Sequence, residues 1–358
     1  MQQISLSKVK FEITELMKAT FESTPAVGVI VVAGTINDVY FNESFGVVHQ
    51  TSLSPITKDT FFDIQSITKV IATVSLLEKF QELGLILLQS LIQNYLPEFH
   101  KGQDCKITIR DLVLHQSGIS DEDFGGNFNS SADLWQSMLN APLRFTPGSS
   151  IEYTDVGYRI LGLCLEKIGG DNLEQLCKKF VWRPLGLENT TYNITNIKKE
   201  NIAGHGTSWG SLDDAQDRFL GKPLGCDGVF TTASDLAAFC QNWLYKLTDE
   251  NIKNKIISVC AGRTNSNWSY YESLGLGKKL FGWEQHDISQ SYSGIRHTFS
   301  TVEKAGGAGA FICLRPEYKD FFIYLTNHGR PDPFSMEAWN ALVNNLKVKE
   351  IASKVLRS

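Results

Sequence analysis

Strand-like segments lie at both ends of this 358-residue chain, and helical segments fill its middle. Residues 26–33 and 39–48 are two β-branched or alternating runs with a turn between them, which predicts a hairpin. Residues 306–314 and 320–327 are apolar and rich in Phe and Ile, and they predict a second hairpin. We therefore expect an α/β protein in which one antiparallel sheet takes strands from both ends of the chain.

Helices are expected on either side of that sheet and between its two halves. Apolar residues at helical spacing predict helices over residues 7–21 and 335–346, which would flank the sheet. The middle of the chain is helical and rich in loops. We predict a discontinuous sheet domain, residues 1–64 and 274–358, with a large and mostly helical domain, residues 65–273, inserted into it.

One segment of the middle carries a candidate nucleophile. Ser66 stands just ahead of an apolar helical pattern over residues 67–83, so that Ser66 and Lys69 would share one face, a turn apart. A serine hydroxyl becomes a nucleophile when a neighbouring base takes its proton, and a lysine amine serves if its pKa falls below its usual value of about 10.4. An apolar surround and the positive end of a helix would both lower the pKa of Lys69. We expect Ser66 to be the nucleophile and Lys69 its base.

Two further segments supply a proton relay and donors for an oxyanion, which such a pair needs. Tyr153 follows the turn at residues 147–148, and nearby ammonium groups would lower the pKa of its phenol. The phenol would then act as base in acylation and protonate the leaving atom. Residues 304–307 (Lys-Ala-Gly-Gly) place glycines where a backbone must approach a substrate closely. We predict that the backbone N–H groups of Ser66 and Gly307 form the oxyanion hole.

Each of these motifs also occurs elsewhere. The competitors are Ser5/Lys8 and Ser7/Lys10 for the serine–lysine pair, Tyr40/Asn42 and Tyr318/Asp320 for the tyrosine, and Lys167-Ile168-Gly169 for the glycines. The competing tyrosines fall in or beside predicted hairpins, where a tyrosine more often packs, and Lys167 ends an ordinary helix. In the purely structural alternative, Ser66 caps its helix and Lys69 is solvated.

Composition narrows the class of protein. The net charge is −5, and lysines and arginines are scattered, which disfavours binding to nucleic acid or to an anionic membrane. Seven cysteines without a Cys-x-x-Cys pair, and no basic region followed by an apolar core near the start, favour a reduced, cytoplasmic protein. No apolar run reaches membrane-spanning length. No metal-ligand spacing or phosphate-binding glycine loop is present, so we expect neither metal nor cofactor.

The motifs together resemble a known family. In chain order, residues 66–69 (Ser-Ile-Thr-Lys), 153–155 (Tyr-Thr-Asp) and 304–306 (Lys-Ala-Gly) resemble the three motifs of the penicillin-recognising serine hydrolases. Their spacing is similar to that of the class C β-lactamase branch, with its esterases, D-aminopeptidases and acyltransferases. Residues 112–118, 146–158 and 228–236 resemble further stretches of that branch. The resemblance spans about residues 25–327.

This resemblance implies roles for individual residues. Ser66 would form the acyl-enzyme, Lys69 would deprotonate it, Tyr153 would shuttle the proton, and Lys304 would hold positive potential over the site. Substrate would contact Asp155, Ala305 and Gly306. The fold of the family, an α/β domain beside a helical one with the active site at their boundary, matches the arrangement of strands and helices described above.

Three positions depart from the family pattern. Asp155 stands where many members carry Asn; close to Lys69 it would favour the ammonium form, and turned away it would hold backbone instead. Ala305 replaces the Thr or Ser that β-lactamases use beside a substrate carboxylate, which argues against efficient penicillin hydrolysis. His297-Thr298 resembles the His-Thr-Gly of esterase relatives, but Phe299 stands where glycine is needed, so Lys304 remains the candidate. We interpret His297, His205 and His286 as loop residues and His115 as a residue that stabilises a turn.

The leading hypothesis is a serine hydrolase that forms an acyl-enzyme on Ser66 and cleaves a small-molecule ester or amide. One alternative is an acyltransferase that passes the same acyl group to an amine or alcohol. Another is a catalytically inactive homologue retained for binding. The sequence leaves the oligomeric state open.

Overall fold

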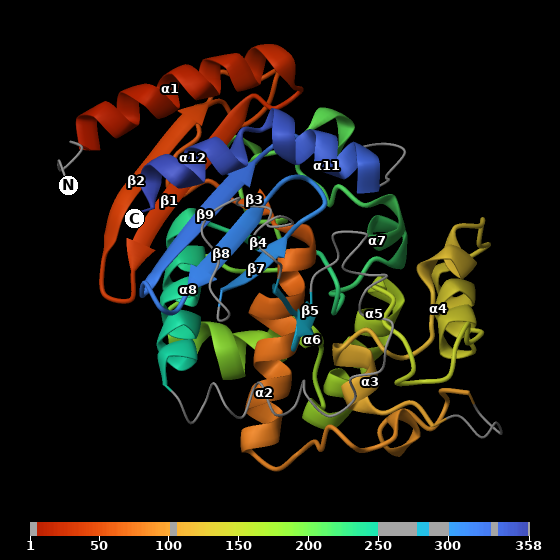
Figure 1. Cartoon of the computed structure of the whole chain (residues 1–358). Helices are drawn as coiled ribbons and strands as arrows, with labels where there is room; N and C mark the ends of the chain where they lie inside the picture. The colour runs from red at the N-terminus through yellow and green to blue at the C-terminus, as the bar shows by residue number, and fades with distance from the viewer. Residues whose placement is uncertain (1–5, 101–105, 250–277, 286–300, 331–335, 357–358) are drawn as a thin grey trace.

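A seven-stranded antiparallel sheet lies at the centre of the molecule (Figure 1), in the order β2-β1-β9-β8-β7-β6-β5. The computed structural model describes residues 6–100, 106–249, 278–285, 301–330 and 336–356. The strands of the sheet are β1 (Gly28–Thr35), β2 (Val39–Gly46), β5 (Lys278–Leu280), β6 (Trp283–Gln285), β7 (Val302–Ala305), β8 (Phe311–Arg315) and β9 (Asp320–Thr326). A second, two-stranded sheet pairs β3 (Phe62–Asp63) with β4 (Phe230–Thr231).

The large sheet joins the two ends of the chain, as the sequence predicted. β1 pairs with β9 so that Val31 lies opposite Tyr324, and both strands are almost entirely buried. One predicted boundary was wrong. Instead of a single strand over residues 306–314, β7 ends at Ala305, and a tight turn follows in which Gly306 N–H donates to the carbonyl of Ala310. Gly309 in that turn has a φ of +95°, a conformation that favours glycine, so residues 306–310 form the turn and only Phe311 onward continues as β8.

Helices cover one face of the sheet from both termini (Figure 1). α1 (Leu6–Ser23), α11 (Met336–Asn345) and α12 (Val348–Val355) lie across it. Ile13 and Met17 of α1, together with Ile351 of α12, share a buried cluster with Val31 of β1. An ion pair of 2.6 Å between Lys354 and Glu12 joins α12 to α1. The predicted helix over residues 335–346 agrees with α11 to within one residue at each end, but the sequence did not predict α12.

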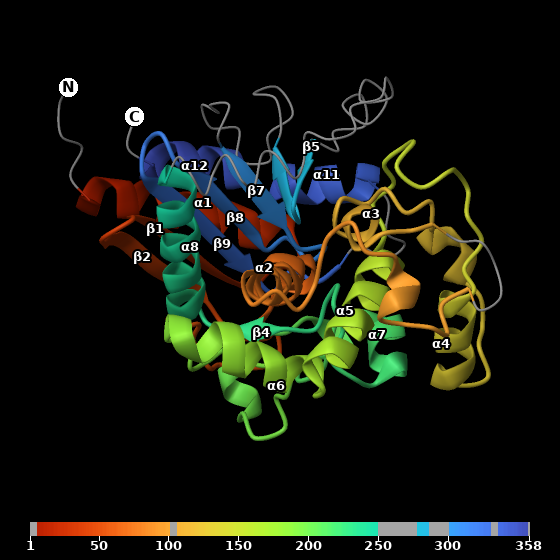
Figure 2. The same ribbon diagram turned by 90° about the horizontal axis from the view of Figure 1, so that it is seen from below.

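The opposite face carries the larger core (Figure 2), in which the helices of residues 65–249 pack. Its α-helices are α2 (Ser75–Glu82), α3 (Ile109–Val113), α4 (Ser131–Leu139), α5 (Asp155–Gly169), α6 (Leu173–Cys177), α7 (Ala215–Leu220) and α8 (Ala233–Thr248). Its short 3₁₀ or π helices are η1 (Gln65–Ile67), η2 (Lys69–Val74), η3 (Ile92–Asn94), η4 (Asp121–Phe124), η5 (Lys178–Trp182), η6 (Arg183–Leu185), η7 (Lys199–Asn201) and η8 (Gly206–Ser208). α8 contacts β1, β8 and β9 directly. The predicted division into two domains, residues 1–64 with 274–358 and residues 65–273, stays a prediction. In that division α8 belongs to the inserted domain although it packs on the sheet.

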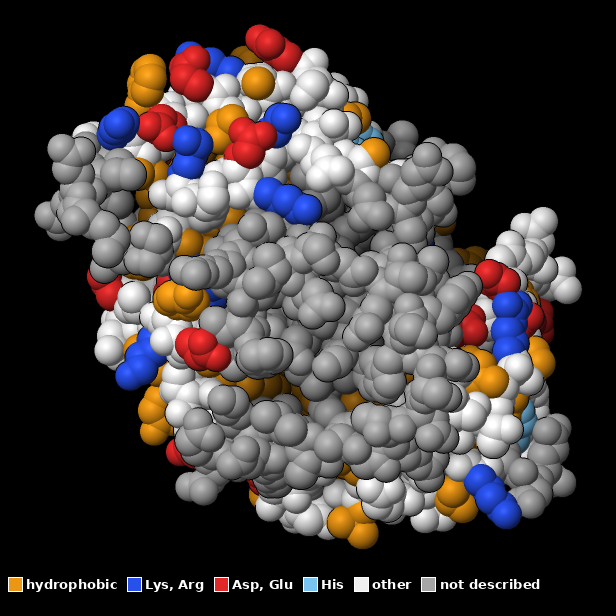
Figure 3. Space-filling model, viewed as in Figure 1, with side chains coloured by type: hydrophobic (Ala, Val, Ile, Leu, Met, Phe, Trp, Pro, Cys, Tyr) orange, Lys and Arg blue, Asp and Glu red, His pale blue; other side chains and the backbone are white. Residues whose placement is uncertain are grey.

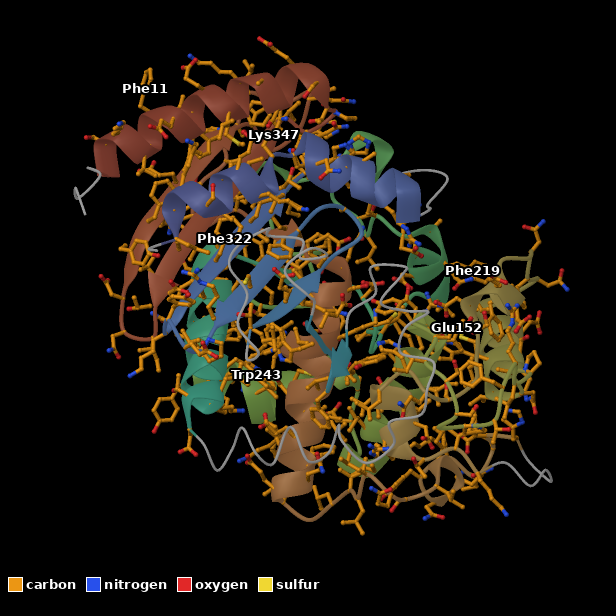
Figure 4. All side chains as sticks on the ribbon, in the orientation of Figure 1. Phe11, Glu152, Phe219, Trp243, Phe322 and Lys347 are labelled. Atoms are coloured by element: carbon orange, nitrogen blue, oxygen red, sulfur yellow. The ribbon has the colours of Figure 1, made fainter. Side chains whose placement is uncertain are left out.

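The described surface mixes charges of both signs. Lys, Arg, Asp and Glu side chains lie interspersed on the face seen in Figure 3. Figure 4 shows Phe11 projecting from α1 away from the molecule, and 66% of Phe11 is exposed. Trp243 on α8 is buried and packs edge-on against Trp283 of β6. Within the described residues, no helix combines the length and apolar character that a membrane span needs.

Candidate active site

The chain around Ser66 passes through three helix types in succession. η1 carries Ser66, η2 is a π-helix that begins at Lys69, and α2 follows. The sequence predicted one continuous helix over residues 67–83, and the structure divides it. Gln65, immediately before Ser66, has a φ of +44°, which is strained for a residue with a side chain. The resulting geometry brings Lys69 Nζ to 3.0 Å from Ser66 Oγ.

Tyr153 reaches the same oxygen from a separate segment. Its phenol Oη donates to Ser66 Oγ at 2.8 Å. The ring stacks on His115 with centroids 4.5 Å apart, and His115 Nδ1 accepts the N–H of Thr154 at 3.1 Å. The Asp121 carboxylate accepts the N–H groups of Asp155 and Val156, which fixes the start of α5 just after Tyr153. His115 thus stabilises the turn that presents Tyr153.

Lys69 is fully buried, and its Nζ has three acceptors around it. These are Ser66 Oγ at 3.0 Å, Asp155 Oδ1 at 2.5 Å and the carbonyl of Cys226 at 3.2 Å. An ammonium has three N–H donors, so this arrangement satisfies the charged form completely. Burial works against that charge, but Asp155 above all, and Asp227 as well, raise the pKa of Lys69 well above its ordinary value. The expectation of a lowered pKa for Lys69 was therefore wrong, because Asp155 turns toward it.

Asp227 is a carboxyl that sequence reasoning missed. It is buried beside Lys69 and Asp155, and its Oδ1 has no hydrogen-bond partner within the described residues. Burial raises its pKa well above the ordinary value, although Lys69 opposes that rise. For Asp155, burial is outweighed by Lys69 and Arg159, which hold its pKa below the ordinary value. The pKa values of these two neighbouring carboxyls are thus shifted in opposite directions, that of Asp155 down and that of Asp227 up.

The fold also brings together a group of possible metal ligands that no sequence spacing revealed. The side-chain ligand atoms of Asp155, Cys226 and Asp227 lie within 4.8 Å of one another. The ammonium of Lys69 already lies among these residues and donates to Asp155 and to the Cys226 carbonyl. Since an ammonium compensates carboxylate charge as a metal ion would, this geometry favours lysine as the cation of the cluster.

Lys304 has a counter-ion that the sequence did not indicate. Its Nζ donates to Glu284 Oε1 of β6 at 3.0 Å, and both side chains are buried. Lys304 Nζ and Lys69 Nζ lie 5.0 and 4.9 Å from the centroid of the Tyr153 ring. Burial nevertheless raises the pKa of Tyr153 well above its ordinary value, with Lys69 opposing and nearby carboxylates adding to the rise. The expected fall in the pKa of Tyr153 was therefore wrong, and at neutral pH the phenol is a proton donor.

The glycines after β7 lie against the turn that carries Ser66. A Cβ added to Gly306 would lie 2.6 Å from the carbonyl oxygen of Ile64, and one added to Gly307 would lie 2.7 Å from Gln65 Oε1. Gly306 therefore has no room for a side chain, as predicted for a strand end that approaches a site closely, whereas a side chain at position 307 would displace only the Gln65 amide. Ala305 is half-buried and pairs with Phe311 of β8. The assignment of the oxyanion hole to the backbone N–H groups of Ser66 and Gly307 stays a prediction.

Replacing Gly306 by Ala should lower kcat about 100-fold. The added methyl meets backbone, so the end of β7 has to move away from Ser66, and a displacement of ~1 Å at an active site has about that effect. Gly125→Ala is the matched control, because its Cβ would meet nothing within 4 Å. Steady-state rates and thermal melts of both variants check this; unchanged kcat in a folded Gly306→Ala protein would contradict the close approach.

The competing motifs lie elsewhere. Lys10 pairs with Glu43, Lys167 pairs with Glu98, and Tyr318 packs under Arg315. His205 stacks on His328 at 6.2 Å, in a loop as expected. Ser5, His286 and His297 lie outside the described residues. Within the described residues the structure thus brings Ser66, Lys69, Asp155, Tyr153 and Lys304 together and leaves the competitors apart.

Comparisons with known proteins show the fold and the family of the chain. A putative D-alanyl-D-alanine carboxypeptidase of Salmonella typhi is 26% identical over 310 residues, which cover 76% of this chain and 70% of that protein. EstCE1, a hydrolase with promiscuous acyltransferase activity, superposes with a TM-score of 0.74 at 18% identity and covers 95% of this chain and 98% of its own. A penicillin-binding protein homologue from Pyrococcus abyssi gives 0.69 at 21% identity, covering 97% of this chain and 79% of its own. The Beta-lactamase family model matches residues 13–345, and the chain belongs to that family.

Proposed function

We propose that the protein is a serine hydrolase that forms an acyl-enzyme on Ser66 and cleaves a small-molecule ester or amide. One observation carries the proposal: Lys69 Nζ and Tyr153 Oη lie 3.0 and 2.8 Å from the same Ser66 oxygen. A nucleophile within hydrogen-bond reach of a base and of a proton donor is the arrangement that acyl transfer needs. Membership of the Beta-lactamase family supports hydrolase chemistry.

The protons can be followed through acylation. In the resting site Lys69 is an ammonium, and it becomes a base only after losing one proton. The neutral amine keeps its two N–H bonds to Asp155 and the Cys226 carbonyl and directs its lone pair at Ser66 Oγ. Lys69 then takes the hydroxyl proton while Ser66 Oγ bonds to the carbonyl carbon of the substrate. Tyr153 donates its proton to the leaving atom as the bond to that atom breaks. Water then attacks the acyl group and gives a proton to the Tyr153 phenolate, while Lys69 returns its proton to Ser66 Oγ as the acid is released.

Ala305, the last residue of β7, indicates which class of substrate the site favours. Ala305 lacks the hydroxyl that would bind a carboxylate beside the scissile bond, so neutral esters and amides are favoured over penicillins. The carboxypeptidase relatives support amide substrates, and the structural likeness to EstCE1 supports esters.

A panel of substrates tests the proposal. Short-chain p-nitrophenyl esters, a D-alanyl-D-alanine peptide and a chromogenic cephalosporin should be compared on the native protein and on Ser66→Ala. We expect ester turnover that Ser66→Ala abolishes, and weaker turnover on the peptide and the cephalosporin, which both carry a carboxylate near the scissile bond. Turnover that persists in Ser66→Ala would contradict Ser66 as the nucleophile. No turnover on any substrate would favour the inactive binding homologue instead.

Acyl transfer is the second candidate. It is favoured by the likeness to EstCE1 and to the simvastatin synthase of Aspergillus terreus, which superposes with a TM-score of 0.72 at 17% identity over 99% of both chains. Chromatography of the products with and without an added alcohol or amine separates the two reactions. A transferase yields the new ester or amide in excess over free acid, and a hydrolase yields free acid at an unchanged rate.

A further inference from the structure

Two carboxylates behind the nucleophile connect the segments that form the site. Asp63 Oδ1 accepts the N–H of Gln65 at 3.0 Å, and Asp63 Oδ2 accepts the N–H of Asp213 at 3.0 Å. Asp213 Oδ2 in turn accepts the side-chain amide of Gln65 at 3.2 Å and the N–H of Arg330 at 2.6 Å. We call Asp63 and Asp213 the carboxylate clasp. Within the described part of the chain, these carboxylates bond to Gln65, Ser208, Arg330 and the N–H of Asp213, so the clasp lies outside the reacting groups.

The clasp closes on the strained residue before the nucleophile. Gln65 is 4% exposed and has a φ of +44°, and strain of this kind persists only where surrounding contacts impose it. The clasp bonds both ends of this residue, its backbone N–H to Asp63 and its amide to Asp213. The position of Ser66, the next residue, depends on the conformation that these bonds impose.

The same residue also touches the strand end opposite Ser66. A Cβ on Gly307 would lie 2.7 Å from Gln65 Oε1 and 3.8 Å from the side chain of Arg330. The amide of Gln65 therefore fills the space between Asp213 and Gly307. The backbone N–H of Arg330 donates to Asp213 of the clasp, and the Arg330 side chain forms an ion pair with Asp214, the next residue along the chain. Four segments meet here: residues 63–66, 208–214, 306–307 and 330.

We infer that Asp63 and Asp213 are positioning residues, which hold Gln65 so that Ser66 and Gly307 keep the separation that acylation requires. The inference rests on the proposed function, since it assigns the clasp to the step in which Ser66 attacks. This role differs from general stabilisation because the clasp holds Gln65, which lies between the nucleophile Ser66 and the strand end at Gly307. A small change there alters the attack geometry and leaves more distant substrate contacts intact.

The hydrogen-bond pattern of the clasp predicts a graded series of variants. Both oxygens of Asp63 accept backbone N–H groups, which can donate but not accept. In Asp63→Asn one oxygen becomes an NH₂ group, so two donors face each other. Asp213 Oδ1 accepts from the Ser208 hydroxyl at 2.8 Å, which can rotate and accept instead. Asp213→Asn therefore keeps Oδ2 as an acceptor, while Asp213→Ala removes the contact. The expected order of activity is native, then Asp213→Asn, then Asp213→Ala and Asp63→Asn.

Ester turnover at pH 8 tests this order. The pKa of Asp63 is raised by burial to about 7, so at pH 8 its carboxyl is ionised. We expect kcat to fall about 10- to 100-fold in Asp63→Asn and Asp213→Ala, with KM within twofold and Asp213→Asn close to native. Asp235→Ala is the matched control, because Asp235 is a buried carboxylate that holds Asn189 and Thr190. It should lower thermal stability without lowering kcat.

Amide hydrogen exchange of the Gln65 N–H gives a readout independent of turnover. Asp63→Asn should speed this exchange at least tenfold relative to Asp235→Ala. Unchanged exchange, unchanged kcat in a folded Asp63→Asn protein, or a change confined to KM would each overturn the inference. If the native protein turns over no substrate, the proposed function fails, and the exchange rate alone decides whether the clasp holds Gln65.

Discussion

Replacing Tyr153 by Phe should lower kcat/KM by about 10²- to 10⁴-fold while leaving the protein folded. The variant removes only the hydroxyl that donates to Ser66 Oγ at 2.8 Å, and a positioned proton donor contributes about that factor to rate. The ring would still stack on His115 and still lie between the ammonium groups of Lys69 and Lys304. Ester turnover and stopped-flow acylation of the native and variant proteins measure the effect.

Tyr158→Phe is the matched control for this loss. The Tyr158 ring also lies near Lys69, with the Nζ 5.6 Å from its centroid, but its hydroxyl donates to the carbonyl of Val113. The control should cost about 1 kcal/mol of stability and leave kcat/KM within twofold. Equal losses in the two variants would show that any buried phenol near Lys69 matters structurally, and would remove Tyr153 from the proton pathway.

Replacing Asp155 by Asn should move the rising limb of the kcat/KM–pH profile to lower pH and raise activity at pH 7. Asp155 stabilises the ammonium of Lys69 and raises its pKa, so in the native protein the reactive amine forms only at high pH. At an effective dielectric constant of about 20, removing one charge at about 4 Å from another is worth about 4 kcal/mol, which corresponds to about three pKa units. We therefore expect the limb to move by two to three units, with the amide oxygen of Asn still available to accept from Lys69.

Glu152→Gln is the control for charge alone. Glu152 precedes Tyr153 on the same loop (Figure 4), and its backbone N–H donates to the carbonyl of His115. Its neutralisation removes one negative charge from this loop and should leave the pH profile in place. A profile that stays unchanged in Asp155→Asn, or that moves to higher pH, would contradict the assignment of Lys69 as the base.

The architecture could be predicted because its strongest signals are local. β1 and β9 are β-branched or aromatic runs of eight and seven residues, long enough to be recognised in the sequence. β5 and β6 have three residues each, which gives no periodicity to detect. α12 escaped notice because Lys347 ends the preceding helix with a φ of +55°, and a single left-handed residue leaves no clear pattern.

The sequence predicted which motif residues lie near one another, but not their charge states. Ser66, Lys69, Tyr153 and Lys304 were chosen from motif order, and the fold places them in contact. The charge state of Lys69 depends on the 2.5 Å distance to Asp155, and the sequence left open whether Asp155 turns toward the lysine or away. Distances between segments almost ninety residues apart follow from tertiary packing, which motif spacing does not encode.

Of the two buried carboxyls that the sequence analysis missed, Asp227 left a signal in the sequence and Glu284 did not. Asp227 interrupts the otherwise apolar or small run of residues 224–230, and an acid in such a run is a candidate for a buried functional group. Glu284 lies in the short strand β6, and its role depends on its ion pair with Lys304 of β7. The pairing of β6 with β7 places Glu284 opposite Glu303, the neighbour of Lys304. That register has no counterpart in the sequence alone.

The most direct test is covalent capture of the nucleophile. The native protein should be incubated with a fluorophosphonate, and its intact mass and the modified peptide should be determined by mass spectrometry. One adduct on the peptide that contains Ser66, absent from Ser66→Ala and slowed in Tyr153→Phe, is the result we predict. An adduct on a different serine, or an unmodified native protein that nonetheless hydrolyses esters, would contradict acylation at Ser66.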